Sequence, residues 1–196
     1  KYPEYAAVVQ GSRYVDLRKE CAEAFKDRPL LAIADSMELI GNPRMLVEIV
    51  TTIRDVISPN SALYIPFAPP HMFCLLVYMG VDLFDTGDAI LNAKKGIIST
   101  QRGHLHLKKI EELPCTCNIC SDKRPEDLLK DQTAILGHNF NITLSAVKEI
   151  RVAIKNNEYR ELVEEKAAVS PQTMAMLRLL DKEKQGFLER YTPIAP

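Results

Sequence analysis

The sequence predicts an α/β protein with a parallel sheet, because four short apolar runs each precede a segment whose apolar residues recur at helical spacing. Strands that alternate with helices form parallel sheets through right-handed crossovers. Three of the four runs carry no charge, which is typical of strands covered on both faces. The pattern fits either a small doubly wound sheet or half of a (β/α)8 barrel. The expected strands cover residues 5–9, 30–34, 62–65 and 81–84.

A helix is expected after each of these runs. Ser12 is a candidate N-cap for the first helix. Asn42 can cap the second, and Pro43 suits its first turn. The sequence contains no GxGxxG or GxxxxGK[ST] motif, so a nucleotide-binding version of the doubly wound sheet has no support. The expected helices cover residues 12–26, 43–57, 70–79 and 87–94.

The pattern changes after residue 95. Two alternating segments, 97–100 and 104–107, flank Gln101-Arg102-Gly103 and predict a β-hairpin. A cysteine cluster follows the hairpin, and the rest of the chain has helical spacing, with Pro171 opening one helix. The later helices are expected at residues 143–156, 158–168 and 171–182, with a helical continuation over 183–191.

The composition excludes several classes of protein. Lys and Arg number 25 against 26 Asp and Glu, which excludes a strongly basic nucleic-acid-binding chain but leaves a local basic face open. No apolar run approaches the roughly 20 residues of a membrane helix, so no membrane partner is expected. The chain starts with Lys1 rather than methionine, and both ends are expected to belong to a longer protein. Five cysteines, an odd number, favour a reducing cytoplasm over a secreted disulfide framework.

Three of the cysteines predict a metal site. Cys115, Cys117 and Cys120 have CxCxxC spacing, and His138, expected just before a helix, supplies a fourth donor. Cys3His is a standard closed zinc set, so we expect Zn²⁺ with a folding role. The alternatives are three free thiols or an iron–sulfur cluster, which normally needs four thiolates. His104 and His106 are rival ligands, although a solvated hairpin face also explains them.

Four blocks of the sequence resemble the tRNA-guanine transglycosylases, and in particular the archaeal branch that makes archaeosine in the tRNA D-loop. The resemblance implies a (β/α)8 barrel with a zinc-binding insertion after the eighth strand. The chain would then hold the C-terminal half of the barrel over residues 1–95, the hairpin and zinc subdomain over 96–142, and helices over 143–196. The blocks are Val8-Val9-Gln10-Gly11, Val81-Asp82-Leu83-Phe84-Asp85, Pro114-Cys115-Thr116-Cys117-Asn118-Ile119-Cys120-Ser121 and Gly137-His138-Asn139.

The resemblance also implies roles for single residues. Asp85 matches the carboxylate at the end of the eighth strand that attacks the ribose C1′ and forms a covalent tRNA intermediate. A helix N-terminus after it would keep it ionised. The alternative is that Asp85 only caps the helix over 87–94. Gln10 matches the glutamine that binds the base, and its alternative role is that of a polar turn residue before Gly11.

Two base-recognition turns depart from the family. Ala34-Asp35-Ser36 replaces a Gly-Gly-Leu-like turn, and the segment from Pro66 to His71 replaces a glycine-rich one. Asp35 and His71 are therefore the expected substrate contacts in these turns. The family's other catalytic Asp, from the early strands, lies outside the chain.

These departures resemble the paralogous archaeosine synthase. That enzyme adds an amine donor, lysine or glutamine, to the nitrile of 7-cyano-7-deazaguanine at position 15 of tRNA. Residues 75–85 and 187–193 also resemble it, and its amine-adding site is expected outside this chain. We therefore expect archaeosine biosynthesis of the synthase type. The alternatives are a base-exchanging transglycosylase that uses Asp85, and a non-catalytic tRNA-binding subunit of a split enzyme.

Two kinds of partner are expected. Lys148, Arg151 and Lys155 form a basic stripe on one helix face that can meet tRNA phosphates, although Glu149, Glu158 and Glu161 could instead neutralise it. The N-terminal half of the barrel, in cis or as a separate subunit, would cover the open edges and inner face of a half barrel. The chain alone is therefore expected to be poorly soluble or to self-associate, and the protein is expected to be a homo- or hetero-oligomer.

Overall fold

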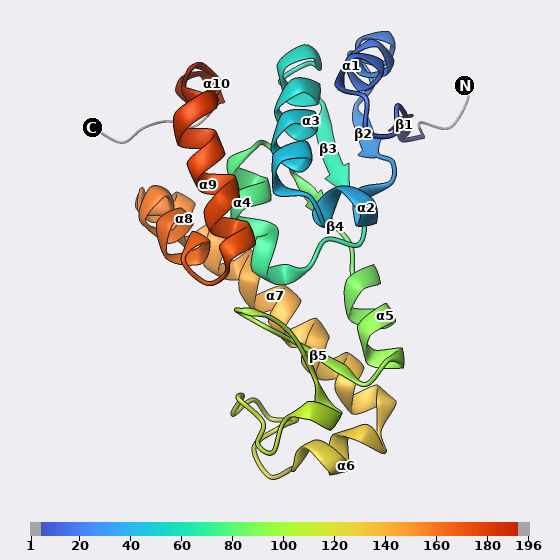
Figure 1. Ribbon diagram of the computed structural model, residues 1–196, viewed down its shortest axis with the longest axis vertical. Coiled ribbons are helices and arrows are strands. Elements are labelled where there is room, and N and C mark those ends of the chain that lie inside the picture. Colours follow the sequence, from blue (N-terminus) through green and yellow to red (C-terminus); the bar gives the residue numbers. More distant parts are fainter. Residues whose placement is uncertain (1–4, 192–196) are drawn as a thin grey trace.

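The computed structural model describes residues 5–191 (Figure 1). Thr192 and Pro193, which belong to one of the synthase-like segments, lie outside the described residues, as do the ends of the first and last predicted domains. None of the described helices is long and apolar enough to cross a membrane.

The predicted parallel sheet is confirmed. Its four strands lie in the order of the sequence, and every neighbouring pair is parallel. The strands are β1 (Ala7–Val9), β2 (Leu30–Ile33), β3 (Ala62–Ile65) and β4 (Leu83–Phe84). The helices that follow them are α1 (Val15–Ala24), α2 (Ser36–Ile40), α3 (Pro43–Val56), the 3₁₀ turn η1 (Pro70–Met72) with α4 (Phe73–Tyr78), and α5 (Gly87–Lys94).

The two faces of the sheet differ in burial. Side chains such as Val9, Leu31 and Leu63 are fully buried beneath the helices. The strand register places the alternate residues in one row across the other face, and the two ends of that row are 46% and 44% exposed. The expectation of two covered faces is thus wrong for residues 5–191, whereas an inner face open to water fits the half barrel. This open row consists of Val8, Ala32, Tyr64 and Leu83.

The starts of α1 and α3 test the predicted caps. Asn42 Oδ1 accepts a hydrogen bond from the amide of Met45 at 3.1 Å, which confirms the cap of α3. Ser12 does not cap α1, because the helix begins at Val15 with Tyr14 as its N-cap. Ser12 instead has a left-handed backbone (φ 49°), and its carbonyl accepts a hydrogen bond from Arg18 Nε at 2.8 Å. Ser12 therefore contacts α1 through its backbone carbonyl, which binds Arg18, and not through a capping hydroxyl.

The hairpin is confirmed as the antiparallel strands β5 (Ile97–Thr100) and β6 (Gly103–His106). It is followed by the 3₁₀ turn η2 (Leu107–Lys109), the helix α6 (Pro125–Leu129) and the long helix α7 (Gln132–Asn156). These elements surround a small hydrophobic core separate from the core beneath the sheet. Its fully packed members are Ala93, Ile98, Leu107, Cys120, Leu128 and Ile135.

Helix α7 joins the two cores, as Figure 1 shows: it runs from the C-terminal helices to the hairpin and α6. The predicted start near residue 143 is wrong, because Asp131 caps the helix by accepting a hydrogen bond from the amide of Ala134 at 2.9 Å. His138 consequently lies inside α7 and not before it. Ile135 packs in the small core and Ile150 in the main one, so the proposed boundary at residues 142–143 falls within one continuous helix.

Three shorter helices close the main core and confirm the predicted ones. They are α8 (Tyr159–Ala167), α9 (Pro171–Glu183) and α10 (Gln185–Tyr191). Ser170 caps α9, since its hydroxyl accepts a hydrogen bond from the amide of Thr173 at 3.1 Å. Arg160 of α8 pairs with Asp181 of α9 at 2.8 Å, which fixes these two helices to each other.

Candidate metal centre and strand-end site

The structure brings the four predicted metal ligands together. The ligand atoms of Cys115, Cys117, Cys120 and His138 all lie within 4.8 Å of one another. His138 Nδ1 is 3.7 Å from Cys117 Sγ and 3.2 Å from Cys120 Sγ. Within residues 5–191 no other group of three or more such donors is as close, so His104 and His106 are not ligands of this site.

The imidazole of His138 has the tautomer that a metal ligand needs. Its Nε2 atom lies 2.9 Å from the carbonyl oxygen of Ser99, which can only accept a hydrogen bond. Nε2 must therefore carry the proton, which leaves the lone pair of Nδ1 facing the sulfur atoms. His138 is fully buried, so β5 fixes the orientation of its ring.

The thiols also favour a cation. Burial opposes ionisation of Cys117, but contact with the imidazole of His138 and hydrogen bonds from backbone amides lower its pKa to about 6. Burial and the adjacent Cys117 raise the pKa of Cys120 to about 12. One thiolate is thus stable in this cluster, whereas a second needs a positive charge beside it. A divalent ion supplies that charge, so the donor set fits a Cys3His metal centre.

Asn139 is a structural residue that the sequence analysis missed. Its amide oxygen accepts a hydrogen bond from the backbone amide of Ser99 at 2.7 Å, and its Nδ2 donates to the carbonyls of Ile97 at 3.0 Å and Ala89 at 3.3 Å. Asn139 is fully buried. It therefore ties α7 to β5 and α5 next to the ligand His138. The block Gly137-His138-Asn139 contained it, but no periodicity could indicate partners so distant in the sequence.

A second site lies at the carboxyl ends of the strands, which meet at one edge of a parallel sheet. Asp85 follows β4, and its Oδ2 accepts a hydrogen bond from the hydroxyl of Tyr64 at 2.5 Å. Its Oδ1 accepts from the amides of Gly87 at 2.8 Å and Phe67 at 3.1 Å. Burial raises the pKa of Tyr64 to about 12, with further contributions from the hydrogen bond and the charge of Asp85, so the phenol stays a donor.

This geometry bears on both roles predicted for Asp85. The bond from Gly87 lies at the start of α5, so Asp85 supports the helix N-terminus although Thr86 occupies the N-cap position. The same donors orient the carboxylate and stabilise its negative charge. An ionised carboxylate with a fixed direction at a strand end can act as a nucleophile.

The neighbouring strand ends hold Gln10 and Asp35. Gln10 follows β1 and is exposed. Asp35 follows β2, and its carboxylate lies 3.4 Å from Nη2 of the fully buried Arg18. Arg18 also donates from Nη1 to the carbonyl of Val9 at 2.6 Å. Arg18 therefore links the ends of β1 and β2, a role that its place in a polar helix did not reveal.

The two turns that lack the family's glycines keep a backbone that glycine favours. Asp35 has φ 56°, and so does Phe67. The hydroxyl of Ser36 donates to the carbonyl of Pro66 at 2.6 Å and joins the two turns. Both turns thus contain a left-handed residue that carries a side chain.

Among residues 5–191, neither His71 nor the basic stripe forms a hydrogen bond with Asp35 or Asp85. His71 belongs to η1, and its ring centroid is 5.8 Å from that of His104. Burial, and then the proximity of His104, lower the pKa of His71 to about 4, so its imidazole is neutral near pH 7.

Lys148, Arg151 and Lys155 are exposed on α7, and no ion pair involves them among the described residues. Glu149 pairs with Lys166 at 2.8 Å instead.

His104 is explained by other contacts. Its Nε2 lies 3.0 Å from Asp88 Oδ2 and 3.1 Å from Asn92 Nδ2, both on α5. The hairpin is thereby attached to α5. His104 and His106 are both exposed, as the solvated hairpin face predicts, although His104 is also paired.

Comparison with known proteins identifies the family. The family described as "TGT: Queuine tRNA-ribosyltransferase" matches residues 2–172. A tRNA-guanine(15) transglycosylase of Methanococcus maripaludis is 33% identical over 201 residues, which are 95% of this chain and 31% of that protein. The enzyme of the same name from Methanosarcina mazei is 34% identical over 197 residues, 96% of this chain and 40% of that protein. The chain thus spans roughly a third of the length of these relatives. It belongs to the TGT family of queuine tRNA-ribosyltransferases, as the four sequence blocks predicted.

Proposed function

We propose that this chain is part of an archaeal tRNA-guanine(15) transglycosylase, which exchanges guanine for 7-cyano-7-deazaguanine with Asp85 as the nucleophile. The observation that carries this proposal is the carboxylate of Asp85, held at the end of β4 by Tyr64, Phe67 and Gly87. The names of the relatives favour base exchange over amine addition of the synthase type, which becomes the second candidate.

The reaction proposed for Asp85 is a double displacement. A carboxylate oxygen attacks the ribose C1′ of the tRNA, and the glycosidic bond breaks with its electron pair leaving on guanine. The incoming base then attacks the same carbon and releases the carboxylate. Tyr64 positions the carboxylate for both steps, since its hydroxyl binds Oδ2 directly.

Trapping the covalent intermediate tests this proposal. The full-length protein is incubated with tRNA and denatured, and a protein–tRNA adduct is sought by gel and mass spectrometry. We expect the adduct in the wild type and in Asp88→Asn, whose side chain pairs with His104 instead, but not in Asp85→Asn. An adduct that persists in Asp85→Asn would exclude this nucleophile. Archaeosine formation without any adduct would favour the synthase, and full activity of Asp85→Ala would favour a non-catalytic subunit.

Zinc is the ion that we propose for the Cys3His centre, in a structural role. Three thiolates and one imidazole form a closed tetrahedral set that leaves no position for substrate. Cys120 packs in the small core and His138 of α7 binds β5. A bound ion would therefore fix the segment that carries the cysteines to α7.

Two partners follow from the surfaces. The basic stripe of Lys148, Arg151 and Lys155 is proposed to bind tRNA phosphates, because no acidic side chain of the described part of the chain neutralises it. The open row on the sheet is proposed to meet the N-terminal half of the barrel, in cis or as a separate subunit. Apolar residues at both ends of the row, Val8 and Leu83, support this second proposal.

A further inference from the structure

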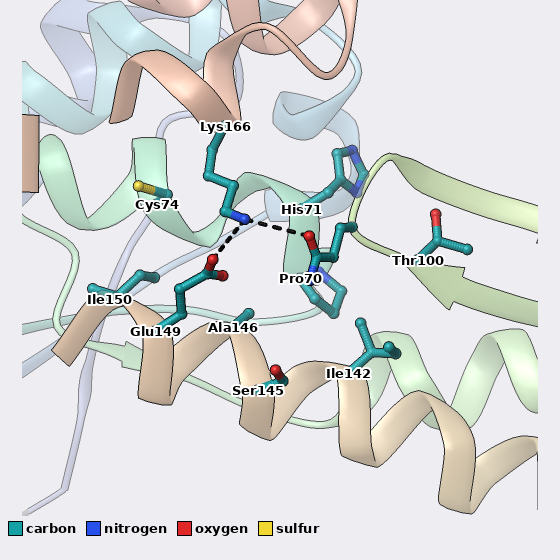
Figure 2. A pocket seen from close by; sticks show the side chains of 11 residues that line it. Pro70, His71, Cys74, Thr100, Ile142, Ser145, Ala146, Glu149, Ile150 and Lys166 are labelled. Atoms are coloured by element: carbon teal, nitrogen blue, oxygen red, sulfur yellow. Dashed lines mark hydrogen bonds and ion pairs between the residues drawn. The ribbon is translucent and has the colours of Figure 1, made fainter. Parts of the chain in front are cut away.

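Three arginine or lysine side chains are buried within residues 5–191. Lys166 is 7% exposed, and it pairs with Glu149 of α7 at 2.8 Å beside the hollow that Figure 2 shows. Lys166 therefore joins two helices. Arg18 and Arg54 are 0% and 5% exposed, and they bind groups at the ends of strands instead.

Arg18 and Arg54 bind the same kinds of group at opposite ends of the sheet. Arg54 binds two carbonyls of the loop that precedes β3, at 2.9 and 3.0 Å, and Asp82, just before β4, at 3.3 Å. Arg18 binds two carbonyls of the chain that leaves β1, at 2.6 and 2.8 Å, and Asp35, which follows β2, at 3.4 Å. Both aspartate side chains are 48% exposed. Parallel sheets bind ligands at the carboxyl ends of their strands, and of the two arginines only Arg18 lies there.

Arg18 fixes the backbone on both sides of Gln10. Its Nη1 donates to the carbonyl of Val9 at 2.6 Å, and its Nε donates to the carbonyl of Ser12 at 2.8 Å. The backbone amide of Gln10 donates to Cys21 Sγ at 3.3 Å. Arg18 and Cys21 both belong to α1, so this helix holds the turn while the exposed side chain of Gln10 stays available to a ligand.

The same guanidinium anchors the carboxylate of Asp35. Asp35 occupies the N-cap position of α2, but its side chain makes no capping bond. Its Oδ2 lies 3.4 Å from Arg18 Nη2, and no hydrogen bond to its Oδ1 occurs among residues 5–191. The attraction between the two charges holds one oxygen in place and leaves the other as an acceptor at the end of β2.

Arg18 does not bind the nucleophile. Asp85 accepts its hydrogen bonds from Tyr64, from the turn after β3 and from the start of α5. Loss of Arg18 would therefore release the turns after β1 and β2 and leave the carboxylate of Asp85 oriented. Such a change affects the binding of a substrate more than the chemical step.

We propose that Arg18 is a positioning residue of the strand-end site, which fixes Gln10 and Asp35 for the base that enters. It sets the affinity for that base and takes no part in the attack by Asp85. This role rests on the base exchange proposed above. It requires arginine, because one planar guanidinium binds three acceptors in a fixed arrangement that a lysine ammonium cannot reproduce.

The kinetics of base exchange test this role. Labelled guanine and tRNA are given to the full-length protein, and kcat and KM for guanine are measured. The variant Arg18→Met keeps an unbranched side chain and removes its donors. We expect its KM for guanine to rise about tenfold or more, while kcat changes less than about threefold.

The matched control is Arg54→Met, which removes a similarly buried guanidinium with the same kinds of partner. It is expected to lower the melting temperature about as much as Arg18→Met does and to keep the wild-type KM for guanine. If either variant fails to fold, Arg18→Lys and Arg54→Lys replace the pair, because an ammonium keeps the charge but lacks the planar fork.

The outcomes separate this role from the base exchange itself. An unchanged KM for guanine in a folded Arg18 variant overturns the role of Arg18, and so does an equal rise in the Arg54 variant. A wild-type protein that incorporates no guanine refutes the base exchange, and the role of Arg18 with it.

Discussion

At the scale of single residues, the sites depend on buried polar side chains that bind backbone groups of other elements. Asn139 contacts β5 and α5, and Arg18 contacts the ends of β1 and β2. The sequence predicted the residues with recognisable chemistry, which are the three cysteines, His138 and Asp85. It could not predict Asn139 or Arg18, because their roles depend on tertiary neighbours and not on residue type or spacing.

Asn139→Ala tests the first of these residues. The variant leaves the amide of Ser99 and two carbonyls unpaired in the interior, so we expect a loss of about 2–4 kcal/mol in the free energy of unfolding. Chemical denaturation of the metal-loaded protein measures it. Asn141→Ala, which removes only a 3.5 Å contact to exposed Asn118, is the matched control and should change stability little. Equal stability of both variants would contradict the role of Asn139.

Tyr64→Phe tests the positioning of Asp85. The variant keeps the ring in the open row and removes only the hydroxyl that binds Oδ2. We expect kcat of base exchange to fall about tenfold or more, with KM for tRNA nearly unchanged, because the carboxylate loses its fixed direction. Stability should fall by no more than about 1 kcal/mol. An unchanged kcat would show that Asp85 needs no such support.

At the scale of elements, α7 determines how the molecule is built. One helix carries the metal ligand His138, the side chain of Asn139 that binds β5, and the basic stripe. Apolar periodicity predicted only its second half. The first half escaped prediction because polar His138 and Asn139 occupy its buried face, and periodicity counts apolar residues alone.

Removal of the metal should destabilise the cysteine-containing segment and leave the sheet and its helices intact. With a strong chelator present, we expect amides of residues 108–131 to lose protection from hydrogen exchange, whereas β2, β3 and α3 keep theirs. The segment packs in the small core, which is separate from the core beneath the sheet. Hydrogen-exchange mass spectrometry gives the comparison. Unchanged protection of residues 108–131 would remove the folding role proposed for zinc.

The basic stripe has its own test. Replacing Lys148, Arg151 and Lys155 by Ala is expected to weaken tRNA binding and to reduce the slope of log K against log salt by about 2–3, since each phosphate contact contributes roughly 0.7–0.9. The control replaces two cations that are exposed on α9, Arg178 and Lys182, and so removes two charges where the stripe variant removes three. Filter binding over a range of salt concentrations measures both. Identical slopes for the stripe variant and the control would refute phosphate contact by α7.

At the scale of the whole molecule, the sheet has one buried face and one open face. The apolar strands and their order were predictable, because β-strands and helices alternate along the chain. The lack of charged residues in the strands did not predict which face of the sheet is covered within residues 5–191. An uncharged strand face can pack against helices, or it can line the inside of a barrel that further strands would complete.

The open face predicts the behaviour of the isolated 196-residue chain. We expect it to self-associate at micromolar concentration, because the row from Val8 to Leu83 exposes apolar side chains beside unpaired strand edges. The double variant Val8→Lys, Leu83→Lys should shift the chain toward monomer in sedimentation velocity. A wild-type chain that is monomeric and melts cooperatively would count against the half barrel.

Tyr64 belongs to this row and also donates its hydroxyl to Asp85. We therefore expect a partner that covers the row to exclude water from the hydrogen-bonded pair of Tyr64 and Asp85 as well. In a chain that lacks the proposed N-terminal half of the barrel, the pair of Tyr64 and Asp85 stays in contact with water. Water then competes for hydrogen bonds to the carboxylate. We expect such incomplete chains not to react with tRNA, so that activity would depend on assembly without a separate regulator.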